Sequence, residues 1–211
     1  INFIMNSNKC TILYGMSGSL KLTTINFLYK EEFKVYSDTK PFFNYDKLYF
    51  NWSGIPNDSH LAIHRLLTLD LEGYLPNDRN IVIERGVSDN IFCVPNRKLP
   101  GLDTYDKIKI KELVDKESEI ISRRSGARIE KILLIMEDKK FIENEVLKED
   151  SRRSIYPDLN IYLSKQDEYI EFTNKWNTIS KTIIIRNAFD YINKLKDYEC
   201  NSEINCSYPS L

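Results

Sequence analysis

The sequence lacks an excess of charge of either sign. Its 30 lysine and arginine residues are balanced by 31 aspartate and glutamate residues, which leaves a formal net charge of −1 at pH 7. Without an overall basic field, nothing draws the whole chain to nucleic acid or to an anionic membrane surface. Long apolar runs are missing too, so no membrane span is predicted. These absences disfavour nucleic acid and membrane as partners and lead us to expect a cytoplasmic protein.

Residues that bind transition metals are scarce as well. The chain has two histidines and four cysteines, and no two cysteines form a C-x-x-C pair, so a zinc site is not expected. Cys10 and Cys93 lie in apolar runs and are predicted to be buried thiols. Cys200 and Cys206 lie in a polar tail and could pair, although a reduced cytosolic protein is the simpler interpretation.

The sequence does contain a regular alternation of apolar runs and helical patterns. Strands are expected at residues 9–14, 33–36, 80–83, 131–136 and 182–185. Helices are expected at residues 23–30, 60–75, 88–94, 107–124, 141–148, 161–176 and 188–196. An irregular aromatic-rich stretch is expected at 42–56, a loop at 95–106 and a polar segment at 150–157. Apolar strands that alternate with helices predict one three-layer α/β domain over residues 1–211, with a five-stranded parallel sheet and a loose tail at 198–211.

The stretch GMSGSLKLTT, residues 15–24, follows the first expected strand and opens the first expected helix. This is the setting of a phosphate-binding loop, whose backbone N–H groups surround a phosphate while a lysine and the helix N-terminus add positive charge. A glycine and serine turn that happens to precede a lysine is the alternative. The residues expected to bind ATP are Gly15, Ser17, Gly18, Ser19, Lys21 and Thr23.

Two leucines depart from the pattern of such loops. Leu20 stands where a glycine normally precedes the lysine, and a positive φ there would cost roughly 1 kcal/mol. Leu22 stands where a hydroxyl normally binds Mg²⁺. Thr23 comes one residue late, about 100° round the helix, so it could bind the metal only in a shifted register. Both changes weaken the prediction of ATP turnover without disturbing the fold.

A carboxylate and an arginine, Glu84 and Arg85, follow the strand expected at 80–83. Ligands of open parallel sheets bind at the carboxyl ends of the strands, so we expect this pair near the loop of residues 15–21. A carboxylate there can hold Mg²⁺, and an arginine can bind phosphate through two hydrogen bonds. The alternative is an ion pair that ends the strand at solvent.

This stretch, IVIERGVSDNIF, resembles the Glu-Arg-Ser motif of deoxyribonucleoside kinases, in which E-R-S is followed by S-D and an aromatic helix. The residues that fit the motif are Glu84, Arg85, Gly86, Ser88, Asp89 and Phe92. Gly86 replaces the serine, and the spacing to Ser-Asp is one residue shorter than in the family. Thymidylate kinases carry a related Asp-Arg pair, so the motif separates these two relatives poorly.

The resemblance extends to two further segments. The family ends its second strand with a carboxylate that acts as general base on the sugar hydroxyl, which implies this role for Asp38, although Asp38 in a turn is an equal alternative. The family also has a lid that supplies arginines to the phosphates. This implies a lid at about residues 149–158 with Arg152 and Arg153, which could otherwise be solvated surface. The pattern continues in the helix after the lid with Tyr162, Leu163 and Tyr169.

The resemblance implies a nucleoside or nucleotide kinase, most like a deoxynucleoside kinase that transfers the γ-phosphoryl group of ATP to a deoxynucleoside. The implied cofactors are ATP and Mg²⁺, with Glu84 and Thr23 as metal residues. The implied catalytic residues are Lys21, Asp38, Glu84, Arg85, Arg152 and Arg153. One alternative is a kinase-like protein that has lost catalysis and binds a protein partner. Another is a kinase that acts on bases within DNA. A homodimer is compatible with each.

Overall fold

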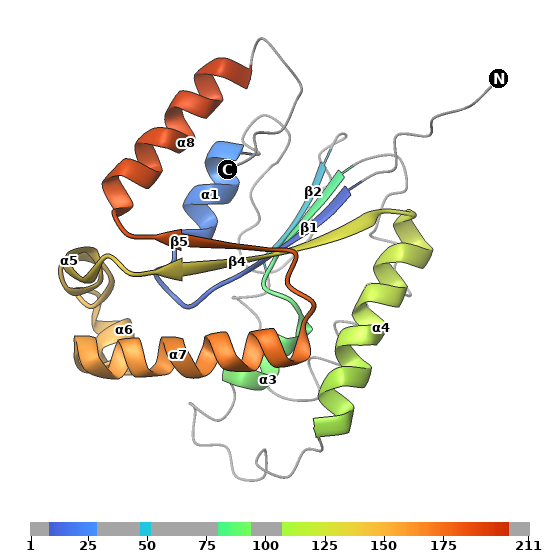
Figure 1. Cartoon of the computed structure of the whole chain (residues 1–211), viewed down its shortest axis with the longest axis horizontal. Helices are drawn as coiled ribbons and strands as arrows, with labels where there is room; N and C mark the ends of the chain where they lie inside the picture. The colour runs from blue at the N-terminus through green and yellow to red at the C-terminus, as the bar shows by residue number, and fades with distance from the viewer. Residues whose placement is uncertain (1–8, 29–46, 52–79, 94–106, 203–211) are drawn as a thin grey trace.

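The centre of the fold is a parallel sheet of five strands (Figure 1). The computed structural model describes residues 9–28, 47–51, 80–93 and 107–202. The strands are β1 (Lys9–Tyr14), β2 (Lys47–Asn51), β3 (Asn80–Glu84), β4 (Arg128–Met136) and β5 (Lys181–Ile185). Their order is β2-β3-β1-β4-β5, and every neighbouring pair is parallel. The predicted α/β class with a five-stranded parallel sheet is therefore confirmed.

Helices cover both faces of this sheet. They are α1 (Lys21–Leu28), α3 (Val87–Cys93), α4 (Lys107–Ser125), α5 (Lys139–Phe141), the π-helical turn η3 (Ile142–Val146), α6 (Asp150–Arg153), α7 (Leu159–Trp176) and α8 (Ala188–Ser202). Figure 1 shows α1 packed beside α8 on one face, with α3, α4 and α7 together on the other. These are the three predicted layers. None of the described helices combines the length and apolar character that a bilayer-spanning segment requires.

The second strand differs from the expected one. β2 lies at Lys47–Asn51, within the aromatic-rich stretch 42–56 that we expected to be irregular. Its sequence, KLYFN, contains residues that favour pleated structure, and parallel pairing with β3 places it at the edge of the sheet. The strand expected at 33–36 and the helix expected at 60–75 lie outside the described residues.

Two helices also differ from the prediction. α6 forms within the polar segment 150–157, where no helix was predicted. α8 continues to Ser202, so the prediction of a loose tail from residue 198 is wrong for its first residues. No proline or glycine interrupts residues 188–202, and nothing in the sequence therefore stops the helix at 197. The remaining tail lies outside the described residues.

The order of the strands determines where a ligand can bind. β1 lies in the middle, with β3 and β2 on one side of it and β4 and β5 on the other. The helix after β1, α1, lies on the α8 face, whereas the helix after β3, α3, lies on the opposite face beside α4 and α7 (Figure 1). In open parallel sheets, ligands bind where adjacent strands send their connections to opposite faces. The carboxyl ends of β1 and β3 are thus the place to seek a site.

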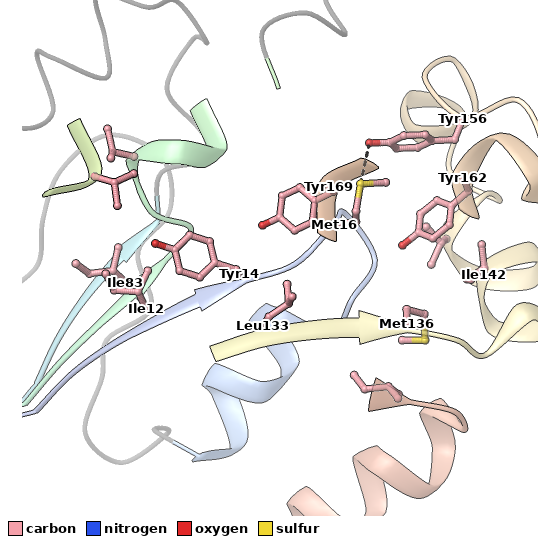
Figure 2. Packing of buried hydrophobic residues seen from close by; sticks show 14 of the residues in the cluster. Ile12, Tyr14, Met16, Ile83, Leu133, Met136, Ile142, Tyr156, Tyr162 and Tyr169 are labelled. Carbon is pink, nitrogen blue, oxygen red and sulfur yellow. Dashed lines mark hydrogen bonds between the residues drawn. The ribbon is translucent and has the colours of Figure 1, made fainter. Parts of the chain in front are cut away.

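A buried glutamine attaches α7 to the carboxyl end of β4. The side chain of Gln166 accepts a hydrogen bond from the Met136 N–H at 3.1 Å and donates one to the Met136 C=O at 2.9 Å. Met136 and Tyr162 lie close by in the buried apolar cluster that Figure 2 shows. A single side chain therefore pairs with both backbone groups of one residue and fixes α7 against the sheet.

We expect Gln166→Leu to lower the free energy of unfolding by about 2 kcal/mol, because the substitution leaves two buried backbone groups of Met136 without their partner. Urea unfolding followed by circular dichroism measures this change. Ser164→Ala, at an exposed position of the same helix, is the control and should stay within about 0.5 kcal/mol of wild type. Equal stability of the two variants would show that the glutamine does not hold the helix.

Candidate functional site

The loop between β1 and α1 turns through three residues of positive φ, Gly15 at 154°, Gly18 at 89° and Leu20 at 62°. The Ser19 N–H donates to the Met16 C=O at 3.1 Å, and the Thr24 N–H donates to the Leu20 C=O at 2.8 Å, which begins the helix. A leucine adopts this left-handed conformation at a cost of roughly 1 kcal/mol or more, which a glycine would not incur. The loop therefore keeps a backbone conformation that favours glycine although residue 20 is leucine.

The lysine that opens α1 is buried inside this loop. Lys21 is 4% exposed. Its Nζ donates to the C=O of Gly15 at 2.7 Å and of Met16 at 2.9 Å, and it lies 3.4 Å from the Ser19 Oγ. An ammonium group that leaves water needs such partners. The loop thus curls around a cation at the N-terminus of a helix, where the helix dipole adds to the positive potential.

Three tyrosine hydroxyls from the segment after β4 contact three consecutive residues of the loop, and Figure 2 shows the contact of Tyr156 with Met16. The pairs are Tyr169 with the Gly15 N–H at 2.9 Å, Tyr156 with the Met16 Sδ at 3.9 Å, and Tyr162 with the Ser17 C=O at 2.8 Å. Val146 of η3 closes the same side, since a Cβ on Gly18 would lie 2.5 Å from its side chain. The outer side of the loop is therefore packed against η3 and α7.

The end of β3 lies beside this loop. Leu13 of β1 is the register partner of Glu84, and the Arg85 N–H donates to the Leu13 C=O at 2.9 Å. Glu84 and Asp89 are both buried, at 7% and 2% exposure. The Tyr169 hydroxyl, which also contacts the loop, lies 2.9 and 3.0 Å from the two carboxylate oxygens of Asp89. The structure thus brings the predicted carboxylate and arginine next to the predicted phosphate loop.

Asp89 is surrounded by charged groups of both signs. Burial raises the pKa of its carboxyl to about 6, while the charge of Arg85, the hydrogen bond from Tyr169 and the charge of Lys21 oppose that rise. The charge of Glu84 raises it further. Such influences require these side chains to lie near Asp89. The candidate site is therefore a cluster of two cations and two carboxylates, of which Lys21, Glu84 and Asp89 are buried and Arg85 is half-buried.

The surroundings of Gly86 leave no room for the serine of the motif that this stretch resembles. A Cβ on Gly86 would lie 2.3 Å from the Tyr14 hydroxyl and 3.0 Å from a carboxylate oxygen of Glu117. The Tyr14 hydroxyl donates to the Asn177 Oδ1 at 3.0 Å, and the Asn177 Nδ2 donates to the Ser88 Oγ at 2.9 Å. This buried polar network occupies the space of a serine side chain and ties α3 to the end of α7.

The hydroxyl that a phosphate loop offers to Mg²⁺ is missing at its usual position. Leu22 stands there with 43% of its surface exposed, and the side chain of Thr23 is half-buried. The Thr24 hydroxyl already bonds the Leu20 C=O at 2.8 Å and lies 2.9 Å from the Tyr191 hydroxyl. Across the described ranges, no three His, Cys, Asp or Glu side chains gather as metal ligands. A Mg²⁺ ion here would depend on phosphate oxygens and water for most of its ligands.

The two arginines predicted in the lid diverge. Arg152 is half-buried and pairs with Glu149 at 3.3 Å. Burial raises the pKa of Tyr162 and the charge of Arg152 lowers it, which places Arg152 near the tyrosine that contacts the loop. Arg153 is exposed, and its Nε donates to the Leu147 C=O at 3.1 Å, toward the end of η3. Arg152 is therefore paired within its own helix turn with Glu149, whereas Arg153 is tied to the segment that precedes α6.

Sequence reasoning missed the tyrosine hydroxyls as partners of the loop. Tyr162 and Tyr169 belong to the predicted pattern after the lid, but the pattern assigns them no contact, and Tyr156 has no place in it. The one available signal is spacing, because Tyr162 and Tyr169 lie two turns apart on one side of α7. Asp38, the predicted general base, lies outside the described residues.

No family model matches the sequence, and no curated protein matches it. Two solved kinases are similar in structure. A deoxyadenosine kinase from M. mycoides, with dCMP and dCDP bound, has 14% identity over 92% of this chain and 99% of its own, with a TM-score of 0.48. A thymidylate kinase from Candida albicans has 12% identity over 95% of this chain and 96% of its own, with a TM-score of 0.49. Scores and identities this low do not assign an activity.

We expect Asp89 to make stability depend on pH. Its folded pKa of about 6 lies above the ordinary value of 3.8, so its proton contributes stability that is fully present below about pH 4 and is lost as the pH rises through about 6. From pH 4 to pH 7, the free energy of unfolding of wild type should therefore fall relative to that of Asp89→Asn.

Urea unfolding at pH 4, 5, 6 and 7 measures this difference. Asp167→Asn, an exposed carboxylate on α7, is the matched control and should differ from wild type by a nearly constant amount. A difference for Asp89→Asn that does not change with pH would mean that the carboxyl is not buried in the way described.

Proposed function

We propose that the chain is a nucleoside or nucleotide kinase, most like a deoxynucleoside kinase that moves the γ-phosphoryl group of ATP to a deoxynucleoside hydroxyl. One observation carries the proposal: buried Lys21 lies in a loop at a helix N-terminus, beside the Glu84–Arg85 pair at the end of the neighbouring strand. This combination suits phosphoryl transfer, because catalysis of that reaction consists largely of positioning the groups and stabilising charge.

The residues of the loop fit a polyphosphate. The first N–H groups of a helix have no acceptors within the helix, and α1 begins with Lys21, whose ammonium group adds a full positive charge. ATP would be held by the backbone of residues 15–21 and by Lys21, with Ser17 and Ser19 lining the loop. Mg²⁺, which neutralises phosphate charge when it is bound, would be held by Glu84, with Thr23 as the remaining hydroxyl.

The arginines and the general base complete the proposed roles. Arg85 and Arg152 would bind phosphate oxygens, since a guanidinium group forms paired hydrogen bonds to them. Arg153 would join them only after leaving the Leu147 carbonyl. Asp38 would accept the proton of the acceptor hydroxyl, a role that rests on the resemblance alone.

A second candidate function is binding without turnover, in which the chain serves a nucleotide or a protein partner. The observation that favours it is the pair of leucines in the loop. Leu20 has φ 62° where a glycine would be relaxed, and Leu22 presents an exposed apolar side chain where a metal-binding hydroxyl is usual. Loss of one ligand at a transferring site commonly costs on the order of 10² to 10³ in rate.

Restoring the loop separates the two candidates. We expect Leu20→Gly combined with Leu22→Ser to bind MgATP roughly ten-fold more tightly than wild type, because strain is relieved and a metal ligand is gained. Turnover of deoxynucleosides should rise with it. Isothermal titration calorimetry and a coupled ADP assay measure the two effects. Ile184→Ser, which removes another exposed apolar side chain, is the control and should leave both unchanged.

The outcomes have distinct meanings. Weak binding by wild type and stronger binding with turnover by the restored loop would support a kinase with a weakened site. Binding by the restored loop without turnover would favour the second candidate. If the restored protein folds but binds no nucleotide, the kinase proposal fails. Lys21→Ala in the restored background should abolish any binding that occurs at the loop.

The proposed lid gives a further prediction. Residues 149–158 contain α6, and the segment contacts the loop through Tyr156 and Met16 and the end of η3 through Arg153 and Leu147. If Arg152 and Arg153 bind phosphate, this segment becomes more ordered on nucleotide binding. Hydrogen exchange of peptides over 149–158 should slow at saturating MgATP, while peptides over β5 should not change. Unchanged exchange in 149–158 during demonstrated binding would contradict a lid.

A further inference from the structure

The hydroxyl of Tyr169 joins two parts of the site that the proposed function leaves separate. It lies 2.9 Å from the Gly15 N at the start of the loop and 2.9 and 3.0 Å from the two carboxylate oxygens of Asp89 on α3. Tyr169 and Asp89 are both 2% exposed. The Tyr169 hydroxyl is within direct hydrogen-bonding distance of both other groups, so it connects α7 to both α3 and the loop.

The direction of each hydrogen bond in this link follows from the groups involved. A backbone N–H can only donate, so the Tyr169 oxygen accepts from Gly15. The tyrosine proton is then directed to Asp89, the acceptor on the other side. Burial, and after it the charge of Asp89, raises the pKa of Tyr169 well above its ordinary value, so the hydroxyl keeps this proton. Asp89 therefore orients the hydroxyl, and the hydroxyl orients the Gly15 peptide.

Tyr162 acts on the next part of the loop in a similar way. Its hydroxyl donates to the Ser17 C=O at 2.8 Å. In a trans peptide the C=O and the following N–H point in opposite directions, so this bond turns the Gly18 N–H away from Tyr162. Gly15 and Ser17 are thus both fixed from α7, while the Lys21 ammonium holds the intervening carbonyls of Gly15 and Met16.

The strained backbone at Leu20 needs contacts from outside the loop to hold it. Its φ of 62° costs roughly 1 kcal/mol or more for a leucine. Such a conformation persists when the surrounding structure holds it in place. The bonds from Tyr162 and Tyr169 are two of the interactions that do so, because they fix loop residues on the N-terminal side of Leu20.

We propose that Tyr169, oriented by Asp89, and Tyr162 are positioning residues that hold the loop of residues 15–21 in the shape that receives a polyphosphate. The inference rests on the proposed function for the identity of the ligand, but the shape of the loop is a property of the protein without nucleotide. Asp89 acts through Tyr169 and not on the phosphate itself. The charged and titratable groups that face it are Lys21, Glu84, Arg85, Tyr14 and Tyr169.

The first test needs no nucleotide. Tyr169→Phe removes the hydroxyl and keeps the ring, which packs edge-on against Phe92 at 5.2 Å. Hydrogen exchange of peptides over residues 15–19 should become about ten-fold faster in Tyr169→Phe. Tyr191→Phe removes a half-buried hydroxyl that bonds Thr24 in α1, outside the loop, and should leave the loop peptides unchanged. Loop exchange in folded Tyr169→Phe equal to that of wild type overturns the proposal whether or not ATP binds.

The second test uses MgATP and the double-mutant cycle of Tyr169→Phe and Asp89→Asn, in the background of the restored loop. Each single variant should weaken MgATP binding roughly five- to ten-fold in calorimetry. If Asp89 acts through Tyr169, Asp89→Asn should have little further effect once the hydroxyl is gone. Tyr162→Phe should weaken MgATP binding both with and without Tyr169→Phe. Additive effects of the two substitutions overturn the role assigned to Asp89.

The two tests keep the failure of this inference apart from the failure of the proposed function. If the restored loop binds no MgATP, the kinase proposal fails, and the exchange experiment still decides whether the tyrosines hold the loop. If MgATP binds and the tyrosine variants bind it as tightly as their parent, the positioning role fails while the kinase proposal stands. A loss of stability alone, with loop exchange and MgATP affinity unchanged, would identify a merely structural role and likewise overturn the inference.

Discussion

The burial of one ammonium group is the constraint on which the site depends. Lys21 is 4% exposed, and a cation taken out of water at this depth must find hydrogen-bond acceptors in the protein. The chain supplies them by folding the preceding residues around it, so that the carbonyls of Gly15 and Met16 point to the Nζ. The curl of the loop therefore determines where the positive charge lies, because the loop carbonyls bind the Lys21 ammonium group.

The second determinant is a single helix. α7 contacts the end of β4 through Gln166, the loop through Tyr162 and Tyr169, and α3 through Tyr169. Asn177, the residue after α7, also bonds α3. The loop that precedes Lys21 and the helix that carries Asp89 are thus both held by α7. A change in the position of α7 would therefore act on several parts of the site together.

The sequence was sufficient for much of the fold because its information is local. Short apolar runs identified β1, β3, β4 and β5, and parallel pairing then placed Glu84 beside the loop. The edge strand β2 escaped notice because its five residues lie in an aromatic-rich stretch without clear alternation. The glycine pattern drew attention to the cost of a positive φ at Leu20, and the structure has a φ of 62° there.

The contacts that support the loop could not be predicted in the same way. The Gly15–Tyr169 bond joins residues 154 positions apart, and the Tyr162–Ser17 bond joins residues 145 apart. No local pattern encodes such pairs, because they depend on how α7 packs across the end of the sheet. The same holds for the difference between Arg152 and Arg153, which is set by a nearby glutamate and a carbonyl at the end of η3.

A crystal structure of the chain with a non-hydrolysable ATP analogue and Mg²⁺ tests the central claim most directly. We predict phosphate oxygens within hydrogen-bonding distance of the backbone N–H groups of Gly18, Leu20 and Lys21 and of the Lys21 Nζ, with Glu84 on the metal side. A nucleotide bound elsewhere, with its phosphates remote from Lys21, would contradict the claim that this loop is a phosphate site.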